Sequence, residues 1–305
     1  MTMGIASTAP AQIQTAHGCV PFPAYVPVTT FGNKYPLDDL VRPYLRRLAP
    51  AVMVSLHYAR QMKERPNLPL MIDSGGFASL FKDARVRMRG GLGILERVME
   101  EGTETLHPRE VLEFQEAHAD IAFTLDFPIP PSMANREAKR RLALTIANAL
   151  WALENRRRRD LVLYACVQGW DVDSYRNCAE ALAPHEFDGY AIGGLIPRMH
   201  DRKHLFAIVD AVRETVADRS LHVFGIGQPE IVEQLYKRGV QSVDSSSYVK
   251  LAADGKLWGA KNSALIEPSP VERLHMALCN LATASRMSMP LSSSGMYFHT
   301  GLVGA

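Results

Sequence analysis

Four polar side chains stand at the ends of short apolar runs, and their types suit chemistry on a sugar and a base. Asp73 ends PLMID, Asp126 ends IAFTLD, Gln168 ends LVLYACVQ, and Asp244 follows QSV. Two carboxylates facing one substrate can divide a substitution at carbon, one attacking and the other moving protons. An anomeric carbon suits such an attack, and an amide beside a carboxylate can hydrogen-bond the edge of a heterocycle.

The apolar runs that precede these groups belong to a set of eight predicted strands. All but the first and last are nearly continuous apolar runs, which is typical of strands buried on both faces of a parallel sheet. Pro27 weakens the first, because proline cannot donate to a sheet ladder. The strands are expected at 24–31, 51–57, 69–73, 121–126, 161–168, 189–194, 221–227 and 241–246.

Helical patterns lie between most of these strands. Apolar residues at helical spacing predict one helix over 132–156 and another from Gln228 to a stop at Gly239, with Pro229 in its first turn. Eight alternating units favour a (β/α)8 TIM-type barrel, whose strand ends deliver side chains to one mouth. We expect a loose arm over 1–20, the barrel over 21–264, and a C-terminal helix near 270–287 with a tail to 305.

Composition sets mild limits on function. The chain has 305 residues and a formal net charge of +2, too small to identify a nucleic-acid binder. Its four cysteines have no paired spacing, no signal sequence is evident, and no apolar stretch approaches the roughly 20 residues of a membrane helix. These features predict a soluble cytoplasmic protein without a bound metal.

Six motifs give the chain a specific resemblance over about residues 50–260. In order and spacing it resembles the tRNA-guanine transglycosylase family. DSGGF is a fairly sharp signal alone, VQG and GGL are weak, and the ordered combination is strong. The motifs are DSGGF at 73–77, LDFPIPP at 125–131, VQG at 167–169, AIGGL at 191–195, GIGQPE at 225–230 and VDSSSYVKLAADG at 243–255.

The resemblance implies a role for each matching residue. Asp244 matches the nucleophile that attacks C1′ of a guanosine nucleotide and holds the sugar as an ester, and Asp73 matches the general acid/base. No cofactor is implied. The residues implied to bind the purine base are Asp126, Gln168, Gly193, Gly194, Leu195, Phe77, Phe224 and Ser74. Alone, Asp126 would also suit a structural carboxylate, and the two phenylalanines would equally suit a core.

One departure from the family bears on the substrate. The resemblance implies that bacterial and eukaryotic relatives acting on tRNA carry a C-x-C-x-x-C run and a downstream histidine that bind zinc, and this chain has no such run after Asp244. The absence favours the DNA-guanine transglycosylase branch (DpdA), which would insert a 7-deazaguanine such as preQ0 into DNA, with tRNA as the alternative. A homodimer and helper proteins are left open as partners.

Basic residues follow several of the predicted strands at the mouth. Phosphate contact is the functional interpretation and ordinary surface charge the alternative. Arg156 to Arg159 are instead assigned to the opposite face, at a helix end. His222 and the other histidines near strand ends are interpreted as hydrogen-bonded structural groups. The predicted nucleic-acid contacts are Arg85, Arg87, Arg89, Arg198, Arg202 and Lys250.

Two hypotheses of different class follow from the sequence. The first is an active base-exchanging enzyme, and the second is a non-catalytic accessory subunit of the same fold that binds nucleic acid or a partner. The presence of both Asp73 and Asp244 favours the enzyme, because a pure binding role needs neither carboxylate.

Overall fold

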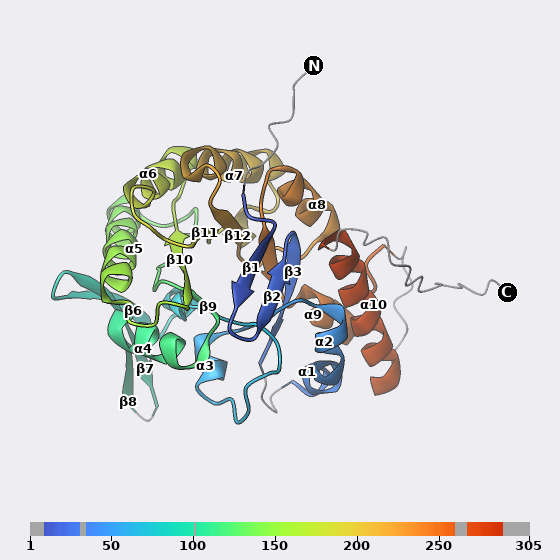
Figure 1. Ribbon diagram of the computed structural model, residues 1–305. Helices are drawn as coiled ribbons and strands as arrows, with labels where there is room; N and C mark the ends of the chain where they lie inside the picture. Colours follow the sequence, from blue (N-terminus) through green and yellow to red (C-terminus); the bar gives the residue numbers. More distant parts are fainter. Residues whose placement is uncertain (1–8, 31–34, 101, 260–266, 289–305) are drawn as a thin grey trace, which may run out of the picture.

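A closed barrel of eight parallel strands forms the centre of the computed structural model, which describes residues 9–30, 35–100, 102–259 and 267–288. The strands follow one another around the barrel in chain order, and each overlaps one of the eight predicted runs (Figure 1). The predicted (β/α)8 fold is therefore confirmed. The strands are β3 (Ala24–Thr29), β4 (Val52–Val54), β5 (Leu70–Ile72), β9 (Ile121–Phe123), β10 (Val162–Val167), β11 (Gly189–Ile192), β12 (Ser220–Val223) and β13 (Ser242–Ser245).

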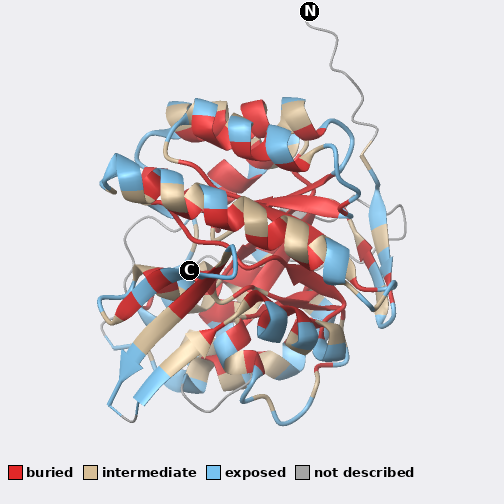
Figure 2. Ribbon diagram, turned by 90° about the vertical axis from the view of Figure 1, so that its left-hand side faces the viewer, coloured by how far each residue is buried: buried red, intermediate tan, exposed pale blue. Residues whose placement is uncertain are grey.

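Helices surround the barrel and cover its strands. Figure 2 shows buried strands inside helices whose outward sides are exposed, as the continuous apolar strands require. The helices predicted over 132–156 and from 228 are confirmed as α5 and α8. The helices are α1 (Pro36–Val41), α2 (Leu45–Leu48), α3 (Leu56–Ala59), α4 (Pro108–His118), α5 (Asn135–Asn155), α6 (Val172–Leu182), α7 (Arg202–Val216), α8 (Pro229–Lys237), α9 (Ser247–Ala253) and α10 (Pro270–Ser288), with short 3-10 turns η1 (Arg42–Tyr44), η2 (Gly76–Leu80) and η3 (Ile196–Arg198).

The alternation of side chains along each strand divides the apolar residues into two cores. One lies between strands and helices, and the other fills the barrel interior with Met53, Met71, Phe123, Tyr164 and Cys166. Because the interior is packed with side chains, the barrel is no pore, and chemistry is confined to its ends.

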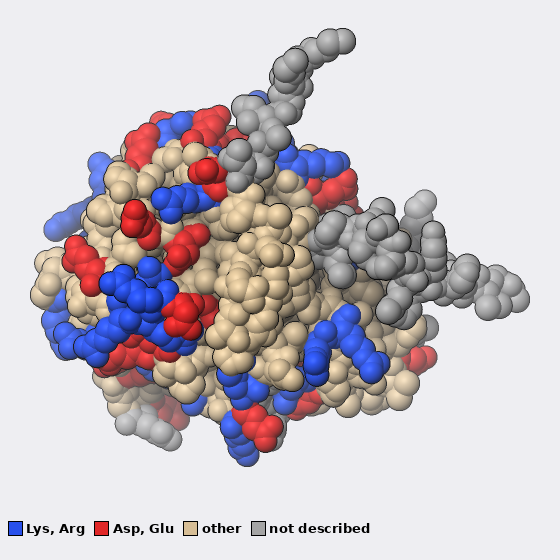
Figure 3. Space-filling view, viewed as in Figure 1, with Lys and Arg blue, Asp and Glu red and all other residues tan. Residues whose placement is uncertain are grey.

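A hairpin of β1 (Gln12–Thr15) and β2 (Gly18–Pro21) closes the barrel at the end opposite Asp73, Gln168 and Asp244. Val20 packs into the barrel interior, and His17 Nδ1 bonds Asp120 Oδ1 at 2.7 Å, just before β9. The hairpin contains no charged Lys, Arg, Asp or Glu, and Figure 3 shows few such residues over the centre of this face. The expectation of a loose arm over 1–20 is therefore wrong for residues 12–20, while residues 1–8 lie outside the described part.

A three-stranded antiparallel sheet interrupts the alternation between β5 and α4. It consists of β6 (Ala84–Arg89), β7 (Leu92–Met99) and β8 (Gly102–Leu106), and sequence analysis did not predict it. The sheet approaches the barrel so closely that a Cβ on Gly93 would lie 2.3 Å from the Phe127 ring. The side-chain amide of Asn148 on α5 bonds both the N–H and the carbonyl of Gly93, which anchors the sheet.

Helix α10 confirms the C-terminal helix predicted near 270–287 and packs against α1, α9 and β3. Its Asn280 donates to the carbonyls of Tyr248 and Lys256 and accepts from the N–H of Trp258. These bonds fasten α10 to the segment that follows the last barrel strand. The predicted tail over 289–305 lies outside the described residues.

Candidate active site

The four groups that the sequence singled out meet at one end of the barrel. Asp73 follows β5, Asp126 lies three residues after β9, Gln168 follows β10, and Asp244 lies in β13. The carboxyl ends of parallel barrel strands share one face, so these groups surround a common mouth. The charges of Asp244 and Asp126 both act on Asp73, as expected for carboxylates gathered in one site.

Asp244 is nearly buried and has one oxygen held by two donors. Its Oδ1 accepts from the backbone N–H of Gly225 at 3.1 Å and lies 3.0 Å from Nε2 of His222. Its Oδ2 accepts no hydrogen bond from any residue in the described part of the chain. One carboxylate oxygen is therefore fixed by the protein, and the other is not held by any of the described residues.

Asp73 is a partly exposed carboxyl whose proton affinity is raised. Burial raises its pKa from 3.8 to about 7, against the lowering effect of N–H donors from Leu56 and Gly75, and the nearby carboxylates of Asp244 and Asp126 raise it further. Both donors bond the same oxygen, Oδ1, at 2.8 and 3.0 Å. A carboxyl with a pKa near neutrality can both give and take a proton at neutral pH.

Asp126 and Gln168 form a hydrogen-bonded pair on neighbouring strand ends. Gln168 Nε2 donates to Asp126 Oδ2 at 2.6 Å, and Ser74 Oγ donates to Oδ1 at 2.6 Å. Burial raises the pKa of Asp126, and the two hydrogen bonds lower it. The Oε1 of Gln168 is buried and has no partner among the described residues. Such an orphan acceptor is costly unless a ligand donor reaches it.

Gly193 and Gly194, which follow β11, let the backbone come close to the side-chain amide of Gln168. A Cβ on Gly193 would lie 2.1 Å from Gln168 Nε2, so no side chain fits there without moving the amide. Gly194 has a φ of +73°, which favours glycine. Tyr175 donates its hydroxyl to the Gly193 carbonyl at 2.7 Å and fixes the turn, an interaction that sequence analysis missed.

The burial and ring contacts of three predicted base-binding residues restrict how each could contact a base. Leu195 has a fully buried side chain, so only its backbone can face a ligand. Phe77 on η2 is 57% exposed and contacts Phe81, whereas Phe224 packs on Phe123 and His222 in the barrel. The sandwich of a base between Phe77 and Phe224 stays a prediction.

The predicted phosphate contacts divide into exposed and buried groups. Arg85, Arg87 and Arg89 are exposed at alternate positions of β6, with Glu96 on β7 close to Arg87 and Arg89. Arg202 at the start of α7 and Lys250 on α9 are also exposed.

Arg198 is a correction to the predicted phosphate contacts. It is only 3% exposed and donates to the carbonyls of Ile129, Gly169, Trp170 and Gly194. Its guanidinium ties three mouth loops together and is not accessible to a phosphate.

Arg156 and Arg158 lie at the opposite end of the barrel, as predicted, where both bond carbonyls near the start of β10 or β9.

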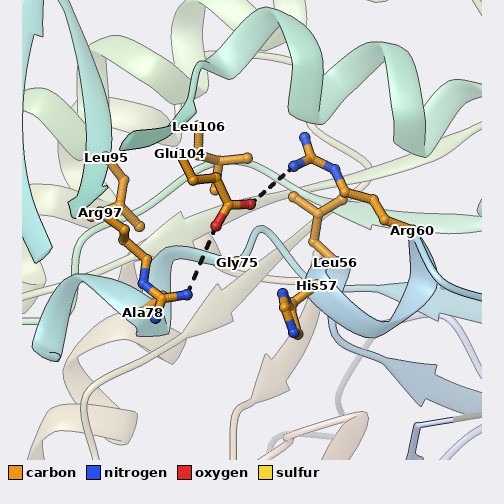
Figure 4. A pocket seen from close by; sticks show the side chains of 9 residues that line it. All are labelled: Leu56, His57, Arg60, Gly75, Ala78, Leu95, Arg97, Glu104 and Leu106. Carbon is orange, nitrogen blue, oxygen red and sulfur yellow. Dashed lines mark ion pairs between the residues drawn. The ribbon is translucent and has the colours of Figure 1, made fainter. Parts of the chain in front are cut away.

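A small pocket of about 40 Å³ separates the antiparallel sheet from the mouth loops. Figure 4 shows Glu104 of β8 between Arg60 and Arg97, with ion-pair distances of 3.5 and 3.8 Å. Leu56 and Gly75, whose N–H groups hold Asp73, line the same pocket. The sheet therefore packs directly behind the loops that position Asp73, and the space suits a few water molecules rather than a substrate.

In the described part of the chain, no group of three or more His, Cys, Asp and Glu side chains is arranged to hold a metal ion. None of the described helices is long and apolar enough to cross a bilayer.

The fold and this mouth define a (β/α)8 barrel that carries the carboxylates of Asp73 and Asp244 and the hydrogen-bonded pair of Asp126 and Gln168 at one end. A family model described as queuine tRNA-ribosyltransferase matches residues 10–279, and the chain belongs to this family.

Two similar proteins are tRNA-guanine(15) transglycosylases. That of Methanothermobacter thermautotrophicus is 25% identical in an alignment that covers 90% of this chain and 41% of that protein. That of Methanobrevibacter smithii is 29% identical in an alignment that covers 65% of this chain and 28% of that protein. The chain thus spans less than half the length of these two relatives. It also resembles the queuine tRNA-ribosyltransferase of Thermoanaerobacter pseudethanolicus, at 25% identity over 85% of this chain and 73% of that protein.

Proposed function

We propose that this protein is a base-exchange transglycosylase that replaces a guanine in tRNA with a free guanine or 7-deazaguanine base. The observation that carries the proposal is the pair of unlike carboxylates at the mouth. Asp244 has a free oxygen, and Asp73 has a pKa near neutrality. A nucleophile and a proton-transfer group are the two functions that substitution at a nucleoside C1′ requires.

In the first half of the proposed reaction, Asp244 displaces the resident base. Its Oδ2 forms a bond to C1′ as the bond from C1′ to N9 breaks, and the electron pair leaves with the base. Asp73 in its acid form supplies the proton that neutralises the departing guanine. The product is an ester between the sugar and Asp244.

In the second half, the incoming base replaces the carboxylate. Asp73, now ionised, removes the proton from N9 of the incoming base, N9 attacks C1′, and the electron pair of the ester bond returns to Asp244. The two displacements each invert C1′ and together retain its configuration. Neither half needs an external oxidant, reductant or energy source, since one glycosidic bond replaces another.

The polar pair Asp126 and Gln168 supplies base recognition in this proposal. A purine edge that brings N–H donors can satisfy the orphan Oε1 of Gln168 and share the carboxylate of Asp126. Gly194 and Leu195 offer only backbone groups to the same edge, and Ser74 orients Asp126 rather than facing a ligand freely.

The relatives favour tRNA over DNA as the nucleic acid. The proteins that the chain resembles are named for guanine exchange or queuine insertion in tRNA, and the DNA preference rested only on the missing zinc run. The exposed Arg85, Arg87, Arg89, Arg202 and Lys250 are the proposed phosphate contacts.

The test is incorporation of radiolabelled guanine into an unmodified tRNA transcript and, separately, into duplex DNA. Wild type is compared with Asp244→Ala and with Asp173→Ala, which removes an exposed carboxylate on α6 as a matched control. We expect label in tRNA with wild type and the control, and none with Asp244→Ala.

Each other outcome has a definite meaning. Label in DNA alone would replace tRNA by DNA as substrate and restore the expectation from the sequence. Label in neither, with intact tRNA binding, would contradict an enzymatic role and favour an accessory subunit. Full activity of Asp244→Ala would refute the assigned nucleophile.

A further inference from the structure

Asp244 is the end of a buried chain of three side chains on β12 and β13. Ser242 Oγ lies 2.7 Å from His222 Nδ1, and His222 Nε2 lies 3.0 Å from Asp244 Oδ1. His222 and Ser242 are direct neighbours in the strand register, and both are fully buried. The three groups therefore point into the barrel from two adjacent strands.

The chemistry of the groups sets the direction of these hydrogen bonds. An ionised carboxylate can only accept, so Nε2 of His222 carries the proton that faces Asp244. In a neutral imidazole the other nitrogen then accepts, and the Ser242 hydroxyl supplies the donor. Ser242 thus selects the ring form in which Nε2 donates to Asp244.

Packing against two aromatic rings also holds the imidazole in place. The His222 ring centroid lies 5.2 Å from that of Phe123 and 4.9 Å from that of Phe224. With the N–H of Gly225, His222 fixes Oδ1 of Asp244 from two directions. The Oδ2 atom has no hydrogen-bond partner among the described residues.

We propose that His222 is a positioning residue for the nucleophile, oriented in turn by Ser242. This inference rests on the proposed function. His222 fixes one carboxylate oxygen so that the other is presented to C1′, and its N–H stabilises the negative charge that returns to Asp244 when the ester breaks. A group fixed in advance loses less entropy in reaching the transition state.

The test separates the hydrogen bond from the shape of the ring. His222→Phe keeps an aromatic ring between Phe123 and Phe224 but removes the donor, while His222→Gln restores an amide N–H near the position of Nε2. Ser242→Ala removes the orienting hydroxyl. The matched control is His17→Phe, which alters the other close histidine–aspartate pair at the far end of the barrel.

The measured quantities are the single-turnover rate of covalent adduct formation with tRNA and the KM for guanine. We expect His222→Phe to slow adduct formation by about 10- to 100-fold, the range for losing a hydrogen bond to a charged group, with KM for guanine little changed. His222→Gln should recover most of the rate, Ser242→Ala should lose less than His222→Phe, and His17→Phe should match wild type. Unfolding midpoints are recorded so that rates refer to folded protein.

Two outcomes would overturn the proposal. Adduct formation by His222→Phe at the wild-type rate would show that the hydrogen bond is dispensable. A loss in His222→Gln as large as that in His222→Phe would also contradict the proposal, because restoring an N–H donor would not restore the rate. Failure of wild type itself to form an adduct would instead contradict the proposed function, so the two failures are distinguishable.

Discussion

Replacing Asp73 by asparagine should stabilise the folded protein at alkaline pH, even as it removes the proposed proton-transfer group. Burial raises the pKa of Asp73 from 3.8 to about 7, so ionising this carboxyl is harder in the folded protein than in the unfolded chain. Asparagine cannot ionise, and its Oδ1 can still accept from the N–H groups of Leu56 and Gly75.

The magnitude follows from linkage between protonation and folding. The contribution of protonated Asp73 is fully present below about pH 4, falls as pH rises, and is lost above about pH 7. The rise in pKa corresponds to at most about 4 kcal/mol, at about 1.4 kcal/mol for each pH unit. Because the side chain is partly exposed and solvent screens its charge, we expect about 2 kcal/mol.

Chemical denaturation of both proteins between pH 4 and pH 9 measures this difference. The free energy of unfolding of Asp73→Asn minus that of wild type should be lowest near pH 4 and should rise by about 2 kcal/mol by pH 8. A difference that stays constant with pH, or that falls as pH rises, would refute the reasoning about the Asp73 carboxyl.

Three further predictions concern activity and binding. The kcat/KM for guanine incorporation should rise with pH through about 7 as Asp73 ionises, and a flat profile in wild type would contradict its role as base. Gly193→Ala should displace the Gln168 amide and raise the guanine Kd by about tenfold or more, measured by calorimetry; unchanged affinity would exclude Gln168 from base binding. Replacing Arg87 and Arg89 by alanine should lower the slope of log Kd for tRNA against log salt by about 1 for each phosphate that the protein no longer neutralises, and an unchanged slope would remove β6 from the interface.

The barrel and its catalytic ends were predictable because the signals are local. Continuous apolar runs such as 161–168 are typical of strands buried on both faces, and a polar residue directly after such a strand lies at the strand end. Asp73 and Gln168 were found this way, whereas Asp244 lies inside β13, in a shorter run with serines on either side.

The elements that escaped prediction carry weaker or non-local signals. In β6 the arginines alternate with Ala84, Val86 and Met88, which is a strand pattern. The strand was not predicted because half of its residues are charged. The first hairpin turns through Ala16 and His17 and lacks the Asn-Gly type of signal.

Two residues of the mouth depend on interactions that the sequence does not reveal. Arg198 is buried because carbonyls from separate loops converge on it, and His222 reaches Asp244 only through the pairing of β12 with β13. Neither interaction has a periodic signature along the chain.

The hairpin of β1 and β2 covers one end of the barrel, so the mouth at the other end is where ligands enter and leave. In the proposed reaction, a base released beside Asp244 leaves by the mouth through which its replacement arrives, because Val20 and the other interior side chains fill the barrel at its other end. Two bases therefore occupy the site in turn rather than together. We therefore expect the outgoing base to inhibit the incoming base competitively. This expectation depends on the architecture of the barrel and not on the chemistry of either base.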